Sequence, residues 1–303
     1  MSRLQTNRDR LVEQSVLGEV SPPRATKGRH WRVGPDGVPR ALPGVGGITY
    51  NCKVGHSAID WEADHVEPGV SVRAEKDDVN DALNLLACVG NAARVVSGDA
   101  KGARGVVTGK HGGIEHVLVD FAQDALERLA VGDKVQIRAC GLGLKLLDAP
   151  EVRVMNMDPD LLDAMGIEVK GGRVRVKVTH TVPAAVMGSG LGSADTLSGD
   201  YDIQLFDDKM VERHGLADLK LGDIVAVMDA DNTYGRIFKS GAVSVGVVVH
   251  SCCVQAGHGP GLTTLLTSAR GFVEPVRSAR ANIAGYLRIG TARLAPRKPK
   301  GRT

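Results

Sequence analysis

Apolar residues along this chain alternate with polar ones more often than they follow a helical period. Residues 173–179 alternate strictly and would place their valines on one side of a strand. The runs 224–228 and 243–249 are rich in β-branched residues and are bounded by Gly or Asp, which is typical of buried strands. Most of the chain is therefore expected to form strands.

Helical patterns are few and short. Residues 77–88 are amphipathic with acidic residues at the start, and residues 158–165 contain an early proline and end before Gly166. A weaker helical pattern runs from residue 1 to Gly18. We therefore expect a mainly β fold, of the α+β type with few short helices, whose body is a β-barrel or sandwich.

The segment 95–107 (VVSGDAKGARGVV) resembles the KOW motif of ribosomal and transcription proteins. That resemblance implies a small SH3-like barrel over residues 93–147, although such a barrel does not by itself define a function. The stretch 22–47 is rich in Pro and Gly and predicts an arm rather than a domain. The expected organisation is an N-terminal arm (1–40), a main β-rich domain (41–92 and 148–285), the embedded SH3-like barrel (93–147) and a basic C-terminal tail (286–303).

The composition is that of a folded protein with an uneven charge distribution. Of 303 residues, 43% are hydrophobic and 24% are charged, which excludes intrinsic disorder. Residues 270–303 carry nine Arg or Lys and one Glu, whereas residues 41–269 are acidic overall. A nucleic-acid-binding domain would carry its basic surface on the fold itself, so the acidic body argues against a nucleic-acid partner.

The five cysteines show no C-x-x-C spacing, and no apolar run approaches the roughly 18 residues that a membrane span requires. We therefore expect a soluble, reduced, cytoplasmic protein without a membrane partner. Few aromatic residues, many strands and basic ends are also compatible with a symmetric homo-oligomer.

The densest group of reactive residues lies in 250–261, directly after the apolar run 243–249. Its histidines could be metal ligands or a general base, its first cysteine a nucleophile, and its glycines a backbone cradle for an oxyanion. A tight turn with packed cysteines is the alternative interpretation. The candidates are His250, Cys252 and His258 for catalysis, and Gly257, Gly259 and Gly261 for substrate binding.

A second group, 56–69, contains two histidines and four carboxylates. Asp64, His65 and Glu67 form a mixed imidazole and carboxylate set that suits Zn, Mn or Fe(II). The spacing matches no established metal motif, and a solvated acidic loop is an equally good interpretation.

The glycine-rich stretch 187–193 has neither a Walker lysine nor the G-x-G-x-x-G spacing, so no nucleotide cofactor is expected. A lid or an anion-binding nest remains open. Asp202 lies two residues after Asp200, so the two would share a face in a strand and form a carboxylate pair. In the Asx-rich turn that follows residue 229, Tyr234 and Arg236 could orient an anionic substrate.

Four stretches together resemble an uncharacterised bacterial and archaeal family, a domain of unknown function. They are 64–70, the KOW-like segment, 199–203 and 241–261 with its Gly-His-Gly-Pro-Gly core. The resemblance implies a largely β protein with a barrel as one component and carries no activity. Cys252 stands where an aspartate is expected, which favours a thiol role there. The glycine-rich loop after an apolar strand is also similar to one in the acetamidase/formamidase amide hydrolases.

These features predict an enzyme that hydrolyses or rearranges a small polar metabolite, such as an amide or lactam, with a divalent metal ion or with a Cys/His pair. This hypothesis requires the segment around His65 and the loop around His258 to meet in one pocket. The alternative is a non-catalytic protein that binds a peptide or a metabolite. A third hypothesis, RNA binding through the small barrel and the basic ends, is opposed by the acidic body.

Overall fold

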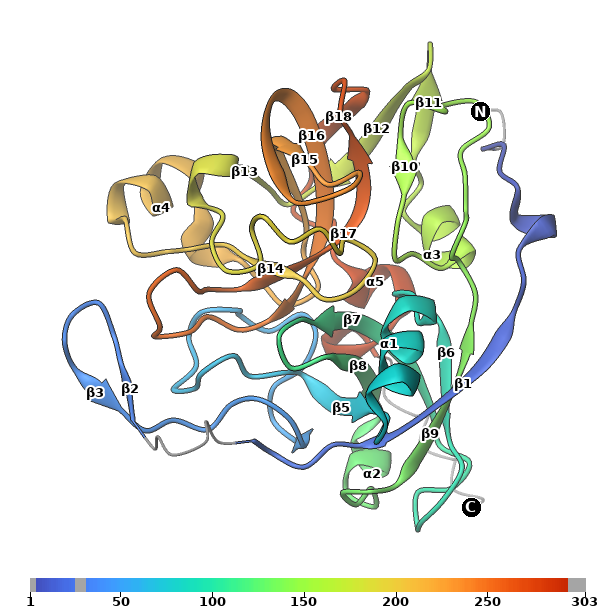
Figure 1. Ribbon diagram of the computed structural model, residues 1–303, viewed down its shortest axis with the longest axis vertical. Coiled ribbons are helices and arrows are strands. Elements are labelled where there is room, and N and C mark those ends of the chain that lie inside the picture. The colour runs from blue at the N-terminus through green and yellow to red at the C-terminus, as the bar shows by residue number, and fades with distance from the viewer. Residues whose placement is uncertain (1–3, 25–30, 294–303) are drawn as a thin grey trace, which may run out of the picture.

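A computed structural model describes residues 4–24 and 31–293 of the chain. The protein is mainly β, with a closed barrel in the lower half of Figure 1 and a second sheet in the upper half. This confirms the fold class expected from the alternation of apolar residues. The candidate site lies where the barrel and the second sheet meet.

The barrel consists of six strands that close on themselves. Strand β1 pairs with both β9 and β5, and this double pairing joins the two ends of the sheet. A closed barrel leaves no unpaired strand edge around the ring. In order the strands are β1 (Gln14–Val20), β9 (Lys134–Ala139), β6 (Ala92–Val95), β7 (Arg104–His111), β8 (His116–Phe121) and β5 (Gly69–Arg73), with β4 (Ile48–Thr49) added beside β5.

Strand β8 shows how the sequence pattern connects the barrel to the rest of the protein. All of its residues are buried, although a strand has two faces. Val117 and Val119 belong to the barrel core, whereas Leu118 belongs to the apolar core shared with the second sheet. A strand buried on both faces needs a continuous apolar run, and β8 has one.

The second sheet has six strands with β16 and β17 at its centre. Val245, Val247 and Val249 of β16 enter the shared core, and Val248 enters a third core on the opposite face. The order is β10 (Arg153–Val154), β17 (Gly261–Ser268), β16 (Ile237–His250), β15 (Ile224–Asp231) and β13 (His180–Pro183), with β14 (Tyr201–Asp202) pairing with β17.

The remaining elements cover these two bodies. A three-stranded sheet contains β11 (Glu168–Lys170), β12 (Arg173–Val178) and β18 (Val273–Arg277), and a short hairpin contains β2 (Arg32–Val33) and β3 (Pro39–Arg40). The α-helices are α1 (Asp77–Leu86), α2 (Gln123–Leu126), α3 (Pro159–Ala164), α4 (Asp208–His214) and α5 (Ile283–Leu287). The 3-10 turns are η1 (Arg8–Arg10), η2 (Ala184–Val186), η3 (Leu216–Asp218) and η4 (Gly290–Ala292).

Strand β7 of the barrel packs directly against β16 and β17. An ideal Cβ built on Gly109 would lie 2.1 Å from Cγ1 of Val249, so only glycine permits this approach. One residue further along, the Lys110 amide donates to Oγ1 of Thr263 (3.2 Å), and that hydroxyl donates to the Lys110 carbonyl (3.0 Å). These contacts place the end of β7 beside the end of β16.

Some elements differ from the sequence-based expectations. The weak helical pattern over 1–18 was the wrong interpretation for its described residues, which form η1 and most of β1. Pairing with β9 and β5 on either side outweighs that weak helical preference. The segment expected to be an arm (1–40) thus supplies a barrel strand, β1. The segment 93–147 supplies four barrel strands, counting β6, and does not form a closed unit by itself.

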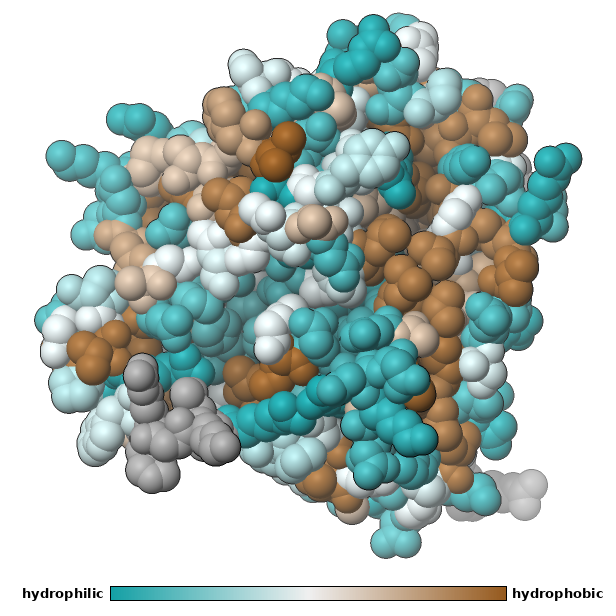
Figure 2. All heavy atoms as spheres, viewed as in Figure 1, coloured by the Kyte–Doolittle hydropathy of each residue, from teal (hydrophilic) through white to brown (hydrophobic). Residues whose placement is uncertain are grey.

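Figure 2 shows one face of the molecule, on which apolar side chains gather along the right-hand edge and polar ones cover most of the remainder. Among the described residues, no helix has both the length and the apolarity that crossing a membrane requires. Of the expected basic tail, residues 294–303 lie outside the described part of the chain.

The contact between β7 and β16 predicts a compensating pair of substitutions. Gly109→Ala should lower the free energy of unfolding by about 1–3 kcal/mol, because the new methyl group overlaps Val249. In a Val249→Ala background the same substitution should lower the free energy of unfolding by less, because the smaller side chain at position 249 leaves room for the new methyl group. Urea unfolding of the two single variants and the double variant measures this coupling, and additive effects would contradict the packing described here.

Candidate metal centre and its pocket

A cavity of about 830 Å³ opens at the junction of the barrel and the second sheet. The barrel contributes the β7–β8 turn, and the second body contributes the loop before β14 and the loop between β16 and β17. Histidine, aspartate and arginine side chains dominate the part nearest the junction. Those that line it are His65, His111, Asp200, Asp202, Arg236 and His258.

Glu67 is fully buried and organises the barrel side of this site. Its carboxylate accepts hydrogen bonds from Nδ1 of His111 (2.5 Å) and from Nδ1 of His116 (3.0 Å). The Gly46 amide (2.8 Å) and the Ser71 hydroxyl also donate to it. Burial alone would raise the pKa of Glu67, but the charges and hydrogen bonds of the two histidines hold it well below its usual value. Glu67 therefore orients histidines and has no oxygen left for the cavity.

The turn that carries these histidines is fixed by α1. Both Asn80 and Asn84 donate side-chain hydrogen bonds to the Glu115 carbonyl, at 3.0 and 3.1 Å. Glu115 itself has a φ of 58°, in the left-handed region that asparagine and glycine more commonly occupy. The hairpin end is thus held in one conformation next to the cavity.

Asp200 and His250 form the most unusual contact of the site. Oδ2 of Asp200 lies 2.7 Å from Nε2 of His250, but the atoms are not aligned for a hydrogen bond, and neither has another partner among the described residues. His250 donates from Nδ1 to the Ser251 carbonyl (2.9 Å), and Asp200 accepts from the Gly112 amide (2.8 Å) through Oδ1. These two atoms therefore lie close together in a fully buried position without a well-aligned hydrogen bond.

A positive charge, either a proton on His250 or a cation between the two groups, would stabilise such a pair. Although burial opposes both charged forms, each group shifts the other, so the pKa of Asp200 is lowered and the pKa of His250 is raised. A proton on Nε2 would point away from the carboxylate, whereas a metal ion accepts lone pairs from both atoms. The side chains of His111, Asp200 and His250 offer ligand atoms within 4.8 Å of one another.

The backbone of β17 leaves room for this arrangement at Gly261. In the sheet Gly261 pairs with Asp202 on one side and with His250 on the other. An ideal Cβ at Gly261 would lie 1.8 Å from Oδ2 of Asp200 and 2.2 Å from Nε2 of His250. The missing side chain allows the two ligand-bearing strands to converge above β17.

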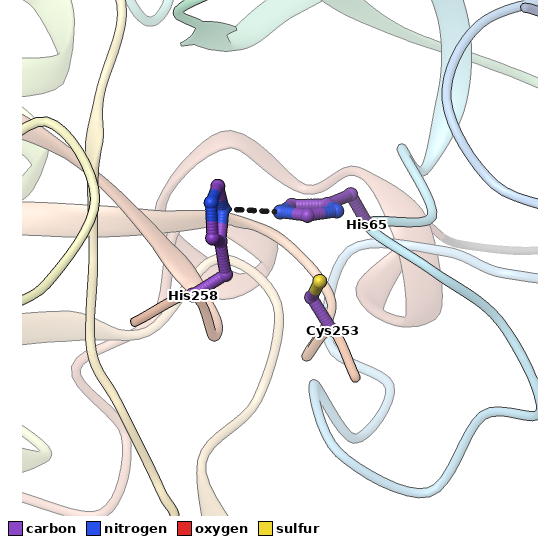
Figure 3. Close-up of side chains that lie close together, drawn as sticks. All are labelled: His65, Cys253 and His258. Carbon is purple, nitrogen blue, oxygen red and sulfur yellow. Dashed lines mark hydrogen bonds between the residues drawn. The ribbon is translucent and has the colours of Figure 1, made fainter. Parts of the chain in front are cut away.

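His65 and His258, from the two sequence clusters, meet in this cavity (Figure 3). Nε2 of His65 lies 3.1 Å from Nδ1 of His258, and the rings are perpendicular. The backbones of the two clusters are joined as well: the Ser251 amide donates to the Val66 carbonyl (3.0 Å), and the Val66 amide donates to Oγ of Ser251 (2.9 Å). These bonds explain why the distant segments converge.

Carboxylates hold both rings. His65 donates from Nδ1 to Asp64 (3.1 Å), and Nδ1 of His258 lies 3.1 Å from Oδ2 of Asp202. Burial alone would lower the pKa of His65, but its carboxylate neighbours Asp202 and Asp64 raise it to about 9. His65 also has a φ of 55°, a strained backbone conformation of the kind found at functional sites.

The proton position on His258 follows from its other neighbours. The Arg32 guanidinium donates to Oε1 of Gln255 (2.6 Å), which directs the amide nitrogen of Gln255 toward Nε2 of His258 (2.9 Å). Nε2 of a neutral His258 is then an acceptor, so the proton resides on Nδ1 beside Asp202. The side chain of His258 is 24% exposed, so this proton lies at the cavity surface.

The cysteines occupy other positions. Cys252 does not line the cavity, its thiol donates to the Cys253 carbonyl (3.6 Å), and burial raises its pKa to about 11. Burial also raises the pKa of Cys253, whose sulfur is directed toward His65 in Figure 3. A thiol protonated at neutral pH is a poor nucleophile, so this geometry does not favour Cys252 in that role.

Of the other site residues predicted from the sequence, some line the cavity and others do not. Arg236 lines the cavity, whereas Tyr234 is 84% exposed beside a separate groove. The Gly259 amide donates to Asp202 (3.2 Å), the Gly257 carbonyl accepts from the Ser189 amide (2.6 Å), and neither glycine lines the cavity. Asp64 and Glu67 orient histidines and do not reach the cavity as ligands.

His111, His116 and Asp200 were absent from the sequence-based set of site residues. Asp200 was visible as the partner of Asp202, but the hairpin that carries His111 and His116 was interpreted only as a barrel loop. The available signal was the pair of histidines flanking a glycine-rich turn. Without the docking of β7 on β16, nothing connects that turn with the loop after His250.

Comparison with known proteins places the whole chain in one family. Residues 31–163 match the N-terminal model, and residues 164–287 the C-terminal model, of a domain of unknown function, DUF4438. The structure is similar to the crystal structure of a protein called TM1086, with a TM-score of 0.90 and 51% sequence identity over 94% of this chain and 99% of that chain. No curated protein matches the chain.

The position of Gly261 predicts a substitution that disrupts the centre. Gly261→Ala should push Asp200 and His250 apart and lower the free energy of unfolding by about 1–3 kcal/mol. The control is Gly285→Ala in α5, where a new Cβ would have nothing within 4 Å. Urea unfolding and imidazole NMR resonances measure the effect, and an unchanged His250 resonance in Gly261→Ala would contradict it.

Proposed function

Since the chain belongs to the DUF4438 family, a family of unknown function, we propose its activity from the site itself: a metal-dependent hydrolase that cleaves an amide or lactam bond in a small polar molecule. The observation that carries this proposal is the buried contact between Asp200 and His250. Their facing atoms are 2.7 Å apart without a well-aligned hydrogen bond, and a bound cation would satisfy both. The ligands are His111, Asp200 and His250.

The outer contacts of these ligands support a metal ion. Metal-binding histidines usually donate their second ring N–H to a carboxylate or a carbonyl, which fixes the tautomer. His111 donates to Glu67 in this way, and His250 donates to the Ser251 carbonyl. Asp202 also has an oxygen 3.6 Å from Nε2 of His250 and is a candidate fourth ligand. Imidazole with carboxylate suits Zn, Mn or Fe(II).

A divalent ion in this position supplies Lewis-acid polarisation of a carbonyl group and lowers the pKa of water. His258 and Asp202 supply proton transfer beside it. His258 lines the cavity, and Oδ2 of Asp202 lies 3.1 Å from its Nδ1 and positions the ring. In hydrolysis the oxygen of water would bond to the carbonyl carbon while one water proton passes to the His258–Asp202 pair. The C–N bond would then break, and that proton would pass to the departing nitrogen.

The cavity supports a small substrate. Its volume of about 830 Å³ lies within the range of roughly 300–1,000 Å³ of small-molecule sites. His250 is fully buried and does not line the cavity, so it fits the role of ligand better than that of base. The same geometry is also open to a second function, a binding protein that holds a metabolite or peptide on the metal without cleaving it.

Metal binding is the first test. The purified protein should bind about one equivalent of Mn²⁺ or Zn²⁺ in calorimetric titration. Glu67→Gln should weaken binding by roughly 10- to 100-fold, because His111 loses its orienting carboxylate, and Asp200→Asn should weaken it more. His214→Ala in α4 is the control and should leave affinity unchanged. No measurable affinity in the correctly folded wild-type protein would reject the metal centre.

Proton transfer is tested with the metal-loaded protein and four amides: acetamide, 2-pyrrolidinone, N-acetylglycine and 5-oxoproline. Release of ammonia or amine is measured. His258→Asn should lower kcat by about 100- to 10,000-fold with little change in metal affinity. A wild-type protein that binds metal but cleaves none of these compounds would contradict the hydrolase and favour the binding protein.

A further inference from the structure

Arg236 is a buried cation in the wall of the cavity. Only 4% of its surface is exposed, and it lines the same cavity as Asp200, Asp202 and His258. Its guanidinium donates to the Ser198 carbonyl (2.9 Å) and the Gly190 carbonyl (3.4 Å). Its Nε is buried and has no hydrogen-bond partner among the described residues. A guanidinium has five N–H donors, so most of this fork is unused.

The charge of Arg236 has no matching carboxylate. Within the described part of the chain it forms no ion pair, and its two acceptors are neutral carbonyls. Asp195 is near enough for the two charges to interact, but its oxygens accept from Ser198 and from the amide of Leu197. A buried charge without a partner is costly, and an anion supplied by a ligand would remove that cost.

The guanidinium is held ready for a ligand. It lies 5.4 Å above the ring of Tyr201, the residue between the two site aspartates. Its main chain is fixed on both sides by the glycine-rich loop: the Gly192 amide donates to the Arg236 carbonyl (2.8 Å), and the Arg236 amide donates to the Ser193 carbonyl (2.9 Å). A planar fork fixed in this way suits bidentate recognition of a carboxylate.

We infer that Arg236 binds a carboxylate of the substrate, so that the molecule cleaved is an amide or lactam that also bears a carboxylate group. This deepens the proposed function and rests on it for the cleavage step, but not for the binding step. Of the other charged residues along the cavity, Asp81, Glu115 and Asp195 are acidic, and the basic Arg32 is already paired with Asp64. A carboxylate is therefore stabilised beside Arg236 and repelled by the acidic residues elsewhere in the wall. This difference orients the substrate so that its amide lies toward the proposed metal ligands.

The competing explanation is that Arg236 only balances the charge of Asp200 and Asp202. Binding of succinate, a dicarboxylate, and of succinamide, its neutral analogue, separates the two explanations. Calorimetry is performed on wild-type protein and on Arg236→Gln, Arg236→Lys and the surface control Arg213→Gln. Each protein is measured both with Mn²⁺ and after metal removal with EDTA, so that binding at Arg236 is distinguished from binding to the metal.

Succinate should bind wild-type protein and Arg213→Gln more tightly than succinamide does. Arg236→Gln should lose about 10- to 100-fold in succinate affinity, the value of one or two charge-assisted hydrogen bonds. Arg236→Lys keeps the charge but loses the planar guanidinium, so its succinate affinity should lie between those of wild-type protein and Arg236→Gln. Circular dichroism checks that this variant is folded.

Equal affinity of wild-type protein for succinate and succinamide would overturn the inference, as would unchanged succinate affinity in Arg236→Gln. Either result could occur while Mn²⁺ still binds, which would leave the metal centre intact. Conversely, succinate binding at Arg236 in a protein that takes up no Mn²⁺ would support the carboxylate site and reject the metal-dependent hydrolase.

Discussion

The close packing of β7 against β16 and β17 is the contact on which the site depends. Gly109 lets the barrel strand touch Val249, and the hydroxyl of Thr263 holds the main chain of Lys110. The next residue of β7 is His111, and the residue after Val249 is His250, with 4.2 Å between their ring centroids. Neither the barrel nor the second sheet contains the site alone, because each contributes ligands that the other lacks.

Burying so many ionisable groups together is tolerated because most of them have a specific partner. Carboxylates hold four of the imidazoles: Glu67 for His111 and His116, Asp64 for His65, and Asp202 for His258. Such pairs offset the loss of hydration that burial imposes and fix the ring orientations. The contact between Asp200 and His250 is different, because the two atoms meet at short distance without a well-aligned hydrogen bond. The proposed ion would complete the pairing that the protein alone leaves unfinished.

The cavity has chemically distinct regions, and this distinction supports one consistent function. The proposed metal ligands and the His258–Asp202 pair lie at the junction of the two bodies, and the guanidinium of Arg236 lies in the wall formed by the glycine-rich loop. A substrate with a cleavable amide and a separate carboxylate would engage both regions. The loop that the sequence left open as a lid or an anion-binding nest thereby gains a specific role, since it fixes the arginine.

The sequence alone determined the mainly β fold, through the alternation at 173–179 and the apolar runs before residues 229 and 250. It also singled out His65, His258 and Asp202, which the structure places along one cavity, because histidines and carboxylates concentrated in short segments are visible in one dimension. Only the tertiary structure decided that Glu67 orients rather than binds, and that His111 joins Asp200 and His250. These residues lie far apart in the chain, and their contact depends on a glycine-mediated packing of two sheets, which no local pattern encodes.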